Sequence, residues 1–176
     1  MTDIVYYVAC SIDGYIATRE GGVAWLDPFQ KGGEDYGFMD FYSSVSALVM
    51  GSHTYEISLK LGPWQAPDKP SWVLTSRDLE VAHPSITLTD EDPAQVVETM
   101  EQRGVERVWL MGGGKLASSF RTAGLLSHYM IAIIPVILGT GIPLFADTSR
   151  QENLELIDLN RYDNGIVMLR YERAAV

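Results

Sequence analysis

The most constraining feature of this 176-residue chain is a run of three glycines, Gly112, Gly113 and Gly114, that directly follows an apolar stretch. The stretch, residues 107–111, is typical of a buried strand, and residues 115–123 have the pattern of a helix. Glycine has no Cβ, so it tolerates positive φ and lets the backbone approach another group closely. Because a helix N-terminus offers unpaired N–H groups to an anion, this junction indicates a phosphate-binding site.

Two common nucleotide motifs are excluded at this junction. A P-loop needs an earlier glycine at fixed spacing and a Ser or Thr directly after its lysine, whereas Leu116 follows Lys115. The dinucleotide fingerprint G-x-G-x-x-G needs a glycine three residues after Gly114, where this chain has Ala117. A tight turn with no ligand is the plain structural alternative, although one glycine usually serves such a turn.

Composition limits the class of protein. The chain is 47% hydrophobic and 20% charged, which suits one globular domain over residues 1–176. With a net charge of −10, it has no surplus of cations to bind nucleic acid. One cysteine, Cys10, excludes an internal disulfide and fits a reducing compartment. Neither a signal peptide nor a bilayer-spanning apolar run is visible, so we expect a cytoplasmic protein without membrane contact.

Strand-like and helix-like segments alternate along the chain. Strands are expected at residues 4–10, 47–50, 71–75, 85–88, 107–111 and 127–134, and helices at 34–45, 52–61, 93–103 and 115–123. Ser52 and Asp92 are candidate N-caps. Residues 154–161 and 166–172 are expected to form a hairpin. This order predicts an α/β fold with a mostly parallel central sheet, an antiparallel C-terminal hairpin and helices on both faces.

Polar or glycine-rich segments follow three of the predicted strands. They are Gly51-Ser52-His53-Thr54, Thr75-Ser76-Arg77 and the three glycines. Ligands of open α/β sheets bind at the carboxyl ends of the strands, so these segments are expected to line one crevice. Arginine suits bidentate phosphate contact, which makes Arg77 a candidate. Simple capping by Ser52 and a solvated loop at Arg77 are the alternative interpretations.

A carboxyl group for proton transfer is expected near the start of the 34–45 helix. Asp35 would face an apolar cleft near Trp25 and Phe38, where desolvation raises the pKa of a carboxyl group and suits it to supply a proton. Glu34 and Asp40 are competing candidates, and favourable charge in a first helical turn is the plain alternative. No cluster of His, Cys and carboxylates has metal-ligand spacing, so no metal is expected.

The ordered set of motifs resembles the dihydrofolate reductase superfamily, in particular the branch named for the C-terminal reductase domain of bacterial riboflavin-biosynthesis deaminase-reductases. The matching segments begin at residues 11 (SIDGYIA), 48 (LVMGSHTYE), 73 (VLTSR), 108 (VWLMGGGK) and 134 (IPVILGTGIPLF). They run through nearly the whole chain in family order. Nothing resembles the zinc motif of the deaminase domain, so the resemblance is to a stand-alone reductase domain.

This resemblance implies hydride transfer from NADPH, or NADH, to a pyrimidine- or pterin-like heterocycle. The expected cofactor contacts are Ala9, Ile16, Gly51, Ser52, His53, Thr54, Thr75, Ser76, Arg77, Gly112, Gly113, Gly114, Lys115 and Leu116. The expected substrate contacts are Ser11, Asp13, Trp25 and Phe38. A gapless alignment from Gly51 gives the catalytic acid position to Asp35 rather than Asp40. Ser52 replaces an arginine that binds the 2′-phosphate of NADPH in the family, so the preference between the two cofactors stays open.

Other interpretations remain at this point. One is a nucleotide-binding sensor without catalysis, motivated by the missing arginine and the unidentified substrate. Another is a reductase of a phosphorylated ribosylaminopyrimidine riboflavin precursor, which the low basic content disfavours unless a local Lys or Arg holds the phosphate. The family resemblance also implies a homodimer, with the apolar region 129–138 as a candidate contact.

Overall fold

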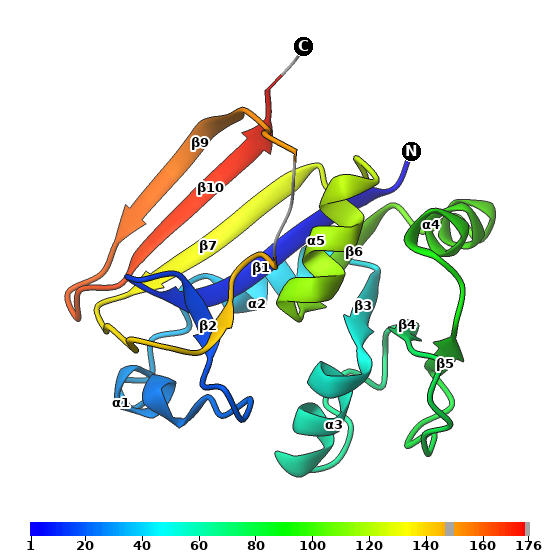
Figure 1. The fold of residues 1–176 in the computed structure, drawn as a ribbon, viewed down its shortest axis with the longest axis horizontal. Coiled ribbons are helices and arrows are strands. Elements are labelled where there is room, and N and C mark those ends of the chain that lie inside the picture. Colours follow the sequence, from blue (N-terminus) through cyan, green and yellow to red (C-terminus); the bar gives the residue numbers. More distant parts are fainter. Residues whose placement is uncertain (147–149, 175–176) are drawn as a thin grey trace.

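The fold was obtained as a computed structural model, which describes residues 1–146 and 150–174. Its centre is an eight-stranded sheet in the order β5-β4-β3-β6-β1-β7-β10-β9 (Figure 1). These strands are β1 (Asp3–Ser11), β3 (Ala47–Gly51), β4 (Ser71–Leu74), β5 (Ile86–Thr89), β6 (Arg107–Gly112), β7 (His128–Ile134), β9 (Leu154–Arg161) and β10 (Val167–Arg173). A small second sheet, not expected from the sequence, pairs β2 (Tyr15–Ala17) with β8 (Ile142–Pro143).

The predicted fold class is confirmed. Strands β5, β4, β3, β6, β1 and β7 are parallel to one another, whereas β10 is antiparallel to both β7 and β9. The helical elements are η1 (Ala24–Leu26), α1 (Asp27–Gln30), α2 (Phe38–Ser44), α3 (Ser52–Lys60), α4 (Pro93–Gln102) and α5 (Gly114–Thr122). In the described part of the chain, none of the helices is long and apolar enough to cross a membrane.

Helices cover both faces of the sheet. Phe120 of α5 is buried in one cluster with Tyr6 of β1, and α4 packs into the same cluster. On the other face Phe41 of α2 is buried beside Val5, and α3 packs near β3 and β4. Because Val5 and Tyr6 are consecutive in a strand, their side chains point to opposite faces, and both are fully buried. The two helical layers therefore shield the central strands from water.

The helix predicted at residues 34–45 begins later than expected. α2 starts at Phe38, because Tyr36 (φ 55°) and Gly37 (φ 77°) are left-handed and cannot belong to a right-handed helix. The Asp35 carboxylate accepts hydrogen bonds from the N–H groups of Gly37 (3.0 Å) and Met39 (3.2 Å). The predicted start was wrong because Asp35 precedes the helix, and its carboxylate accepts hydrogen bonds from backbone N–H groups at the helix N-terminus.

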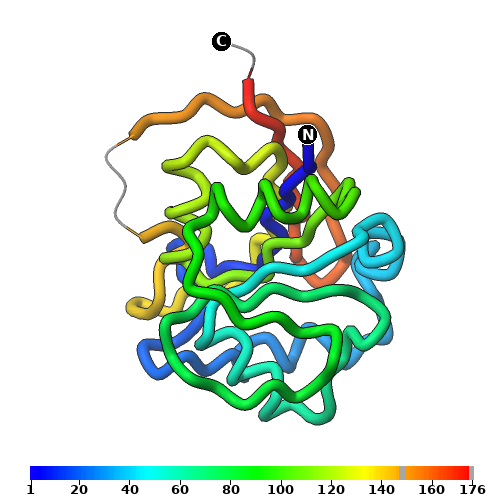
Figure 2. The backbone as a smooth tube through the Cα atoms, turned by 90° about the vertical axis from the view of Figure 1, so that its right-hand side faces the viewer, coloured from blue at the N-terminus to red at the C-terminus, as the bar shows by residue number. Residues whose placement is uncertain are grey.

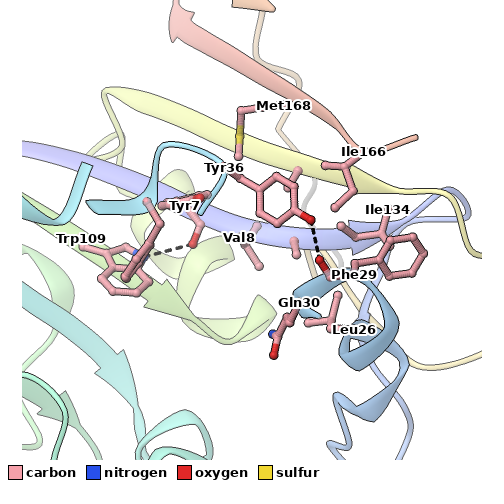
Figure 3. A pocket seen from close by; sticks show the side chains of 13 residues that line it. Tyr7, Val8, Leu26, Phe29, Gln30, Tyr36, Trp109, Ile134, Ile166 and Met168 are labelled. Carbon is pink, nitrogen blue, oxygen red and sulfur yellow. Dashed lines mark hydrogen bonds between the residues drawn. The ribbon is translucent and has the colours of Figure 1, made fainter. Parts of the chain in front are cut away.

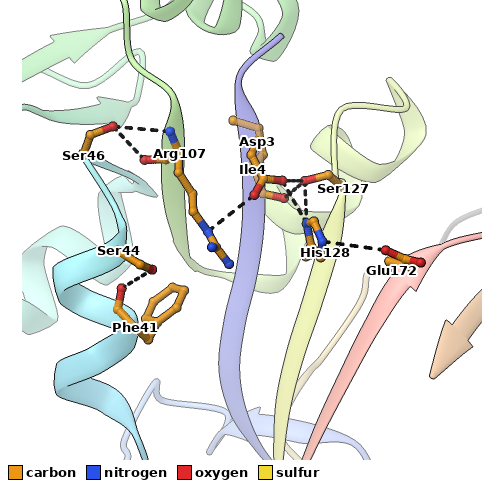
Figure 4. A network of polar contacts seen from close by, with 9 residues as sticks. All are labelled: Asp3, Ile4, Phe41, Ser44, Ser46, Arg107, Ser127, His128 and Glu172. Carbon is orange, nitrogen blue, oxygen red and sulfur yellow. Dashed lines mark hydrogen bonds and ion pairs between the residues drawn. The ribbon is translucent and has the colours of Figure 1, made fainter. Parts of the chain in front are cut away.

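A polar network ties the amino ends of the central strands together (Figure 4). Asp3 of β1 accepts a hydrogen bond from the Ser127 hydroxyl, and its Oδ1 lies 2.9 Å from Nδ1 of His128 in β7. On the other side, Nε of Arg107 in β6 lies 3.4 Å from Asp3 Oδ2. The network holds β6, β1 and β7 side by side at the end of the sheet opposite the expected crevice.

Strand β9 is an edge of the sheet (Figure 1), and Figure 2 views the molecule from the opposite side, where β5 lies. All eight of its residues are exposed, and Leu156, Ile157 and Leu159 keep 48%, 47% and 54% of their surface in contact with water. An apolar edge of this kind usually pairs with another chain or is protected. The 129–138 region, by contrast, lies mainly in β7, most of which is buried.

We propose that β9 is the contact of the homodimer expected above. Light scattering after size exclusion should then give twice the chain mass. Leu159→Asp should give a monomer, because burying a carboxylate in an isologous contact is penalised in both subunits. Leu61→Asp, which changes another exposed leucine just after α3, should stay dimeric. A wild-type protein that is monomeric at micromolar concentration would contradict this proposal.

Candidate functional site

The carboxyl ends of β1 and β6 separate and open a slot in the sheet. β1 pairs with β6 only as far as Tyr6, but with β7 as far as Ser11. Beyond Tyr6, the Tyr7 carbonyl accepts a hydrogen bond from the indole N–H of Trp109 at 3.1 Å. Ligands of open α/β sheets bind at such openings beyond the carboxyl ends of the strands.

The three glycines after β6 have different structural roles. Gly112 has φ +126°, which side-chain-bearing residues rarely adopt, and its peptide bond to Gly113 is cis. Gly114 opens α5, and a Cβ there would overlap the carbonyl oxygen of Pro143. Gly113 has extended backbone, and the nearest atom to a Cβ there is Thr54 Oγ1 at 3.9 Å. The fold therefore requires Gly112 and Gly114, whereas Gly113 leaves room that the fold itself does not use.

Two helix N-termini meet beside these glycines. Gly51 is the N-cap of α3 and Gly113 is the N-cap of α5, and neither helix start receives a side-chain cap hydrogen bond. β3 and β6, which lead into them, are neighbouring strands. Ser52 is the first residue of α3, so its predicted role as N-cap was wrong. α4, in contrast, starts with the predicted cap Asp92 in a capping box with Gln95. Uncapped N–H groups suit α3 and α5 to bind an anion.

The loop between β2 and η1 contacts His53, the second residue of α3. A Cβ at Gly21 would overlap the imidazole of His53, so the ring lies directly against this loop. Ile16 of β2 is partly buried against the core cluster that contains Phe120 of α5. Lys115 is exposed in the first turn of α5, and Leu116 is partly buried beneath it. The expected cofactor residues of β2, α3 and α5 thus lie around the carboxyl ends of the strands.

Arg77 does not present a free guanidinium. It forms a bidentate pair with Glu56 of α3, with Nη1–Oε2 and Nη2–Oε1 distances of 2.9 and 2.8 Å. The pair holds the pKa of Glu56 below its usual range. Thr75 Oγ1 accepts the N–H of Arg77 at 3.0 Å, and Ser76 is exposed. Arg77, the candidate for phosphate contact, is therefore already paired with a carboxylate that would compete with a phosphate.

An aromatic cavity of about 330 Å³ lies next to the slot (Figure 3). Strands β1, β7 and β10 form one side, and α1 with the segment before α2 forms the other. The lining residues are Tyr7, Val8, Ala9, Leu26, Phe29, Gln30, Tyr36, Phe38, Trp109, Ala132, Ile134, Ile166 and Met168. Only Ala9 and Phe38 among them were expected site residues. The others escaped prediction because apolar residues scattered through several strands look like ordinary core.

The predicted acid lies outside this cavity. Asp35 is exposed, so the expectation of a desolvated carboxyl group was wrong. Its neighbours Tyr36 and Phe38 line the cavity, which leaves Asp35 at the edge of it. Asp40, the competing candidate, is exposed on α2. Trp25 packs in the same apolar cluster as Tyr36 without lining the cavity.

Ser11 and Asp13 fasten loops near the slot. The buried Ser11 hydroxyl accepts the N–H of Tyr15 at 3.0 Å. The Asp13 carboxylate accepts the N–H groups of Leu138 and Gly139 at 3.1 and 2.7 Å. A hydrogen bond with Ser11, followed by these two, holds the pKa of Asp13 below its usual range. Ser11 thus fixes the turn between β1 and β2, whereas Asp13 joins that turn to the loop after β7; neither side chain lines the cavity.

No group of three or more His, Cys, Asp or Glu residues in ranges 1–146 and 150–174 is arranged to hold a metal ion. The site offers backbone donors, hydroxyl groups and aromatic rings. Together with the slot between β1 and β6, these features define an α/β domain of the dihydrofolate-reductase-like class.

Comparison with known proteins assigns the family. The sequence profile of the RibD C-terminal domain matches residues 2–168, and the chain belongs to this family. One relative is YwjB of Bacillus subtilis (strain 168), which is 33% identical over 171 residues; the match covers 97% of each chain. Another is the dihydrofolate reductase HdrB of Haloferax volcanii, which is 30% identical over 124 residues; the match covers 68% of this chain and 61% of HdrB.

Among solved structures, a putative riboflavin biosynthesis protein from Shewanella sp. PV-4 superimposes with a TM-score of 0.87 at 26% identity. The superposition covers 99% of this chain and 100% of that one. The resemblance predicted from the sequence motifs is thereby confirmed. Membership of this family indicates an oxidoreductase.

Proposed function

We propose that this chain is a NAD(P)H-dependent reductase that transfers a hydride to a C=N or C=O bond of a pyrimidine- or pterin-like heterocycle. The observation that carries this proposal is the junction of an anion-binding surface with an aromatic cavity along one strand. β6 contributes Trp109 to the cavity and ends at Gly112, beside the uncapped starts of α3 and α5. A dinucleotide bound across this junction would bring its reactive ring to the cavity.

The residues present fit such a cofactor. Gly113 leaves the space that a Cβ would fill, and Thr54 Oγ1 lies beside it. From the two helix starts, the sheet order leads to the β1 slot on one side and to β4 on the other. A nicotinamide would thus reach Ala9, and an adenosine would reach Thr75, Ser76 and Arg77. The bound cofactor supplies the hydride, and the protein contributes orientation and exclusion of water.

Turnover tests this proposal. Purified protein should oxidise NADPH or NADH in the presence of at least one member of a panel of aminopyrimidines and pteridines. Oxidation should be stoichiometric with reduction of the heterocycle and absent without protein. If both nucleotides bind but no member of the panel is reduced, the protein is better described as a nicotinamide-nucleotide sensor. The exposed position of Asp35, outside the cavity, is the observation that favours this second candidate.

Asp35 remains our proposed proton source, acting through water at the edge of the cavity. Asp35→Asn should lower turnover at least about tenfold, as expected when a general acid is lost, and leave NADPH affinity unchanged. Asp40→Asn is the matched control and should turn over at the wild-type rate. Steady-state kinetics with one established substrate decides between them, and equal rates for wild type and Asp35→Asn would remove Asp35 from the mechanism.

The pair between Arg77 and Glu56 should tune the choice of cofactor. Glu56→Gln removes the carboxylate that accepts both hydrogen bonds from the Arg77 guanidinium. Arg77 would then be available to bind the 2′-phosphate of NADPH. The ratio of NADPH to NADH affinity should rise by roughly three- to tenfold, since the freed guanidinium would make charge-assisted hydrogen bonds that solvent partly screens. Glu80→Gln, on the loop after β4, should leave the ratio unchanged. A constant ratio in Glu56→Gln would place the adenosine elsewhere.

We also propose that the reaction takes place in the cytoplasm. The single cysteine, Cys10, is buried as a free thiol in β1. Such a thiol is compatible with a reducing compartment, in which disulfides have no structural role.

A further inference from the structure

The cavity beside the proposed nicotinamide position has walls without formal charge. None of its lining residues in the described chain is Asp, Glu, Lys, Arg or His. The ring of Trp109 lies 5.4 Å from that of Phe38 and 6.1 Å from that of Tyr7, measured between centroids. Ile134 and Met168 add aliphatic surface from β7 and β10 (Figure 3). Such walls favour stacking with a planar ring and offer no positive charge to an anion.

Only two side-chain polar groups in the cavity are left to orient a ligand. The Tyr36 hydroxyl donates to the Phe29 carbonyl and accepts from Nδ2 of Asn164 at 2.6 Å. The Tyr7 hydroxyl and the Gln30 amide, in contrast, make no hydrogen bond within the described residues. Burial raises the pKa of Tyr7 to about 12, so its hydroxyl stays protonated and can donate at neutral pH.

The rim of the cavity is acidic. Tyr162 packs against the cavity residue Tyr36 with a centroid distance of 4.9 Å, so it marks this rim. Burial raises the pKa of Tyr162, and nearby carboxylates raise it further; they belong to Glu34, Asp35 and Asp158. The one cation acting on Tyr162, Arg170, has its Nε 3.7 Å from Asp158 Oδ2. A phosphate at this rim would meet three carboxylates and one guanidinium, whose charge Asp158 partly offsets from ion-pair distance.

We propose, on the basis of the reductase function above, that the site takes a planar heterocycle without a phosphate group, either neutral or cationic. It discriminates against the phosphorylated ribosylaminopyrimidine that the resemblance to bifunctional enzymes would suggest. The aromatic walls hold the ring, and the Tyr7 hydroxyl and the Gln30 amide orient it. The acidic rim disfavours an attached phosphate by like-charge repulsion.

Matched pairs of ligands test this inference by isothermal titration without cofactor. The first pair is an aminopyrimidine riboside and its 5′-phosphate, and the second is neopterin and its monophosphate. The unphosphorylated member of each pair should bind at least about tenfold more tightly. Equal or tighter binding of the phosphorylated member in either pair, or no binding by any of the four compounds, overturns the inference.

One pair of variants isolates the role of the rim. Asp158→Asn removes a rim carboxylate and frees Arg170, so the preference for the unphosphorylated member should fall by roughly threefold or more. Glu98→Gln removes the same charge from α4, on the opposite face of the sheet, and should keep the wild-type preference. An unchanged preference in Asp158→Asn would overturn the assignment of discrimination to the rim.

A parallel titration with NADPH separates this inference from the proposed function. If NADPH binds and the phosphorylated compounds are preferred, the substrate class proposed here fails while the reductase function stands. If neither NADPH nor NADH binds but the unphosphorylated compounds are preferred, the reductase function fails while the selectivity of the cavity stands.

Discussion

Gly114→Ala should destabilise the folded chain by about 1–3 kcal/mol, the usual cost of forcing extra volume into a packed site. A Cβ at Gly114 would overlap the Pro143 carbonyl oxygen and lie 3.4 Å from that of Leu144. Both are backbone atoms, so relief requires α5 to move away from the 143–144 segment. Alanine favours a helix over glycine by roughly 1 kcal/mol, which offsets only part of this cost.

Thermal unfolding measures this effect, and the expected fall in Tm is several degrees for a chain of this size. Gly32→Ala is the matched control, because a Cβ at Gly32 meets no atom within 4 Å and its backbone does not need positive φ. It should unfold at or slightly above the wild-type temperature. Equal Tm values for the two variants would mean that Gly114 is not the contact point between α5 and β8.

Gly113→Ala should weaken cofactor binding without lowering the stability of the fold, in contrast to Gly114→Ala. Its extended backbone accepts alanine, and the nearest atom to the new Cβ would be Thr54 Oγ1 at an ordinary 3.9 Å. The Tm should therefore change little. NADPH affinity should fall at least about tenfold, or about 1.4 kcal/mol, because the new methyl group occupies the space reserved for the diphosphate. Unchanged affinity would show that the free space at Gly113 is not part of a cofactor site.

These neighbouring glycines also show what sequence reasoning could reach. The triple glycine after a strand was interpreted as one phosphate-binding feature, whereas the structure divides it among three roles. Gly112 is needed for its positive φ, and Gly114 is needed for its close contact with Pro143, which is distant in the sequence. Long-range contacts of this kind leave no local pattern, so the sequence could not separate the glycine that faces a ligand from those that serve packing.

The alternation of strands and helices was predictable because it depends on local periodicity. The parallel sheet and the C-terminal hairpin followed from it and are confirmed. The start of α2 was not predictable, because Glu34 and Asp35 suit a first helical turn by composition. The left-handed conformations of Tyr36 and Gly37 decide the boundary instead.

The walls of the cavity were missed for a related reason. Tyr7, Trp109 and Met168 lie in three different strands and look like core residues in each. Arg77 was correctly seen as a polar residue after a strand, but its pairing with Glu56 depends on the packing of α3 beside β4. Local sequence indicates which side chains reach the carboxyl edge of the sheet, and tertiary structure decides which of them are free to bind a ligand.

The most direct test of the central claim is a titration of the wild-type protein with NADPH and NADH, followed through the fluorescence of its four tryptophans. Trp109 lines the cavity next to the proposed nicotinamide position, so bound nucleotide should quench it. The account predicts saturable quenching by at least one of the two nucleotides, with one site per chain and weaker binding in Gly113→Ala. The absence of saturable binding by both nucleotides would contradict it.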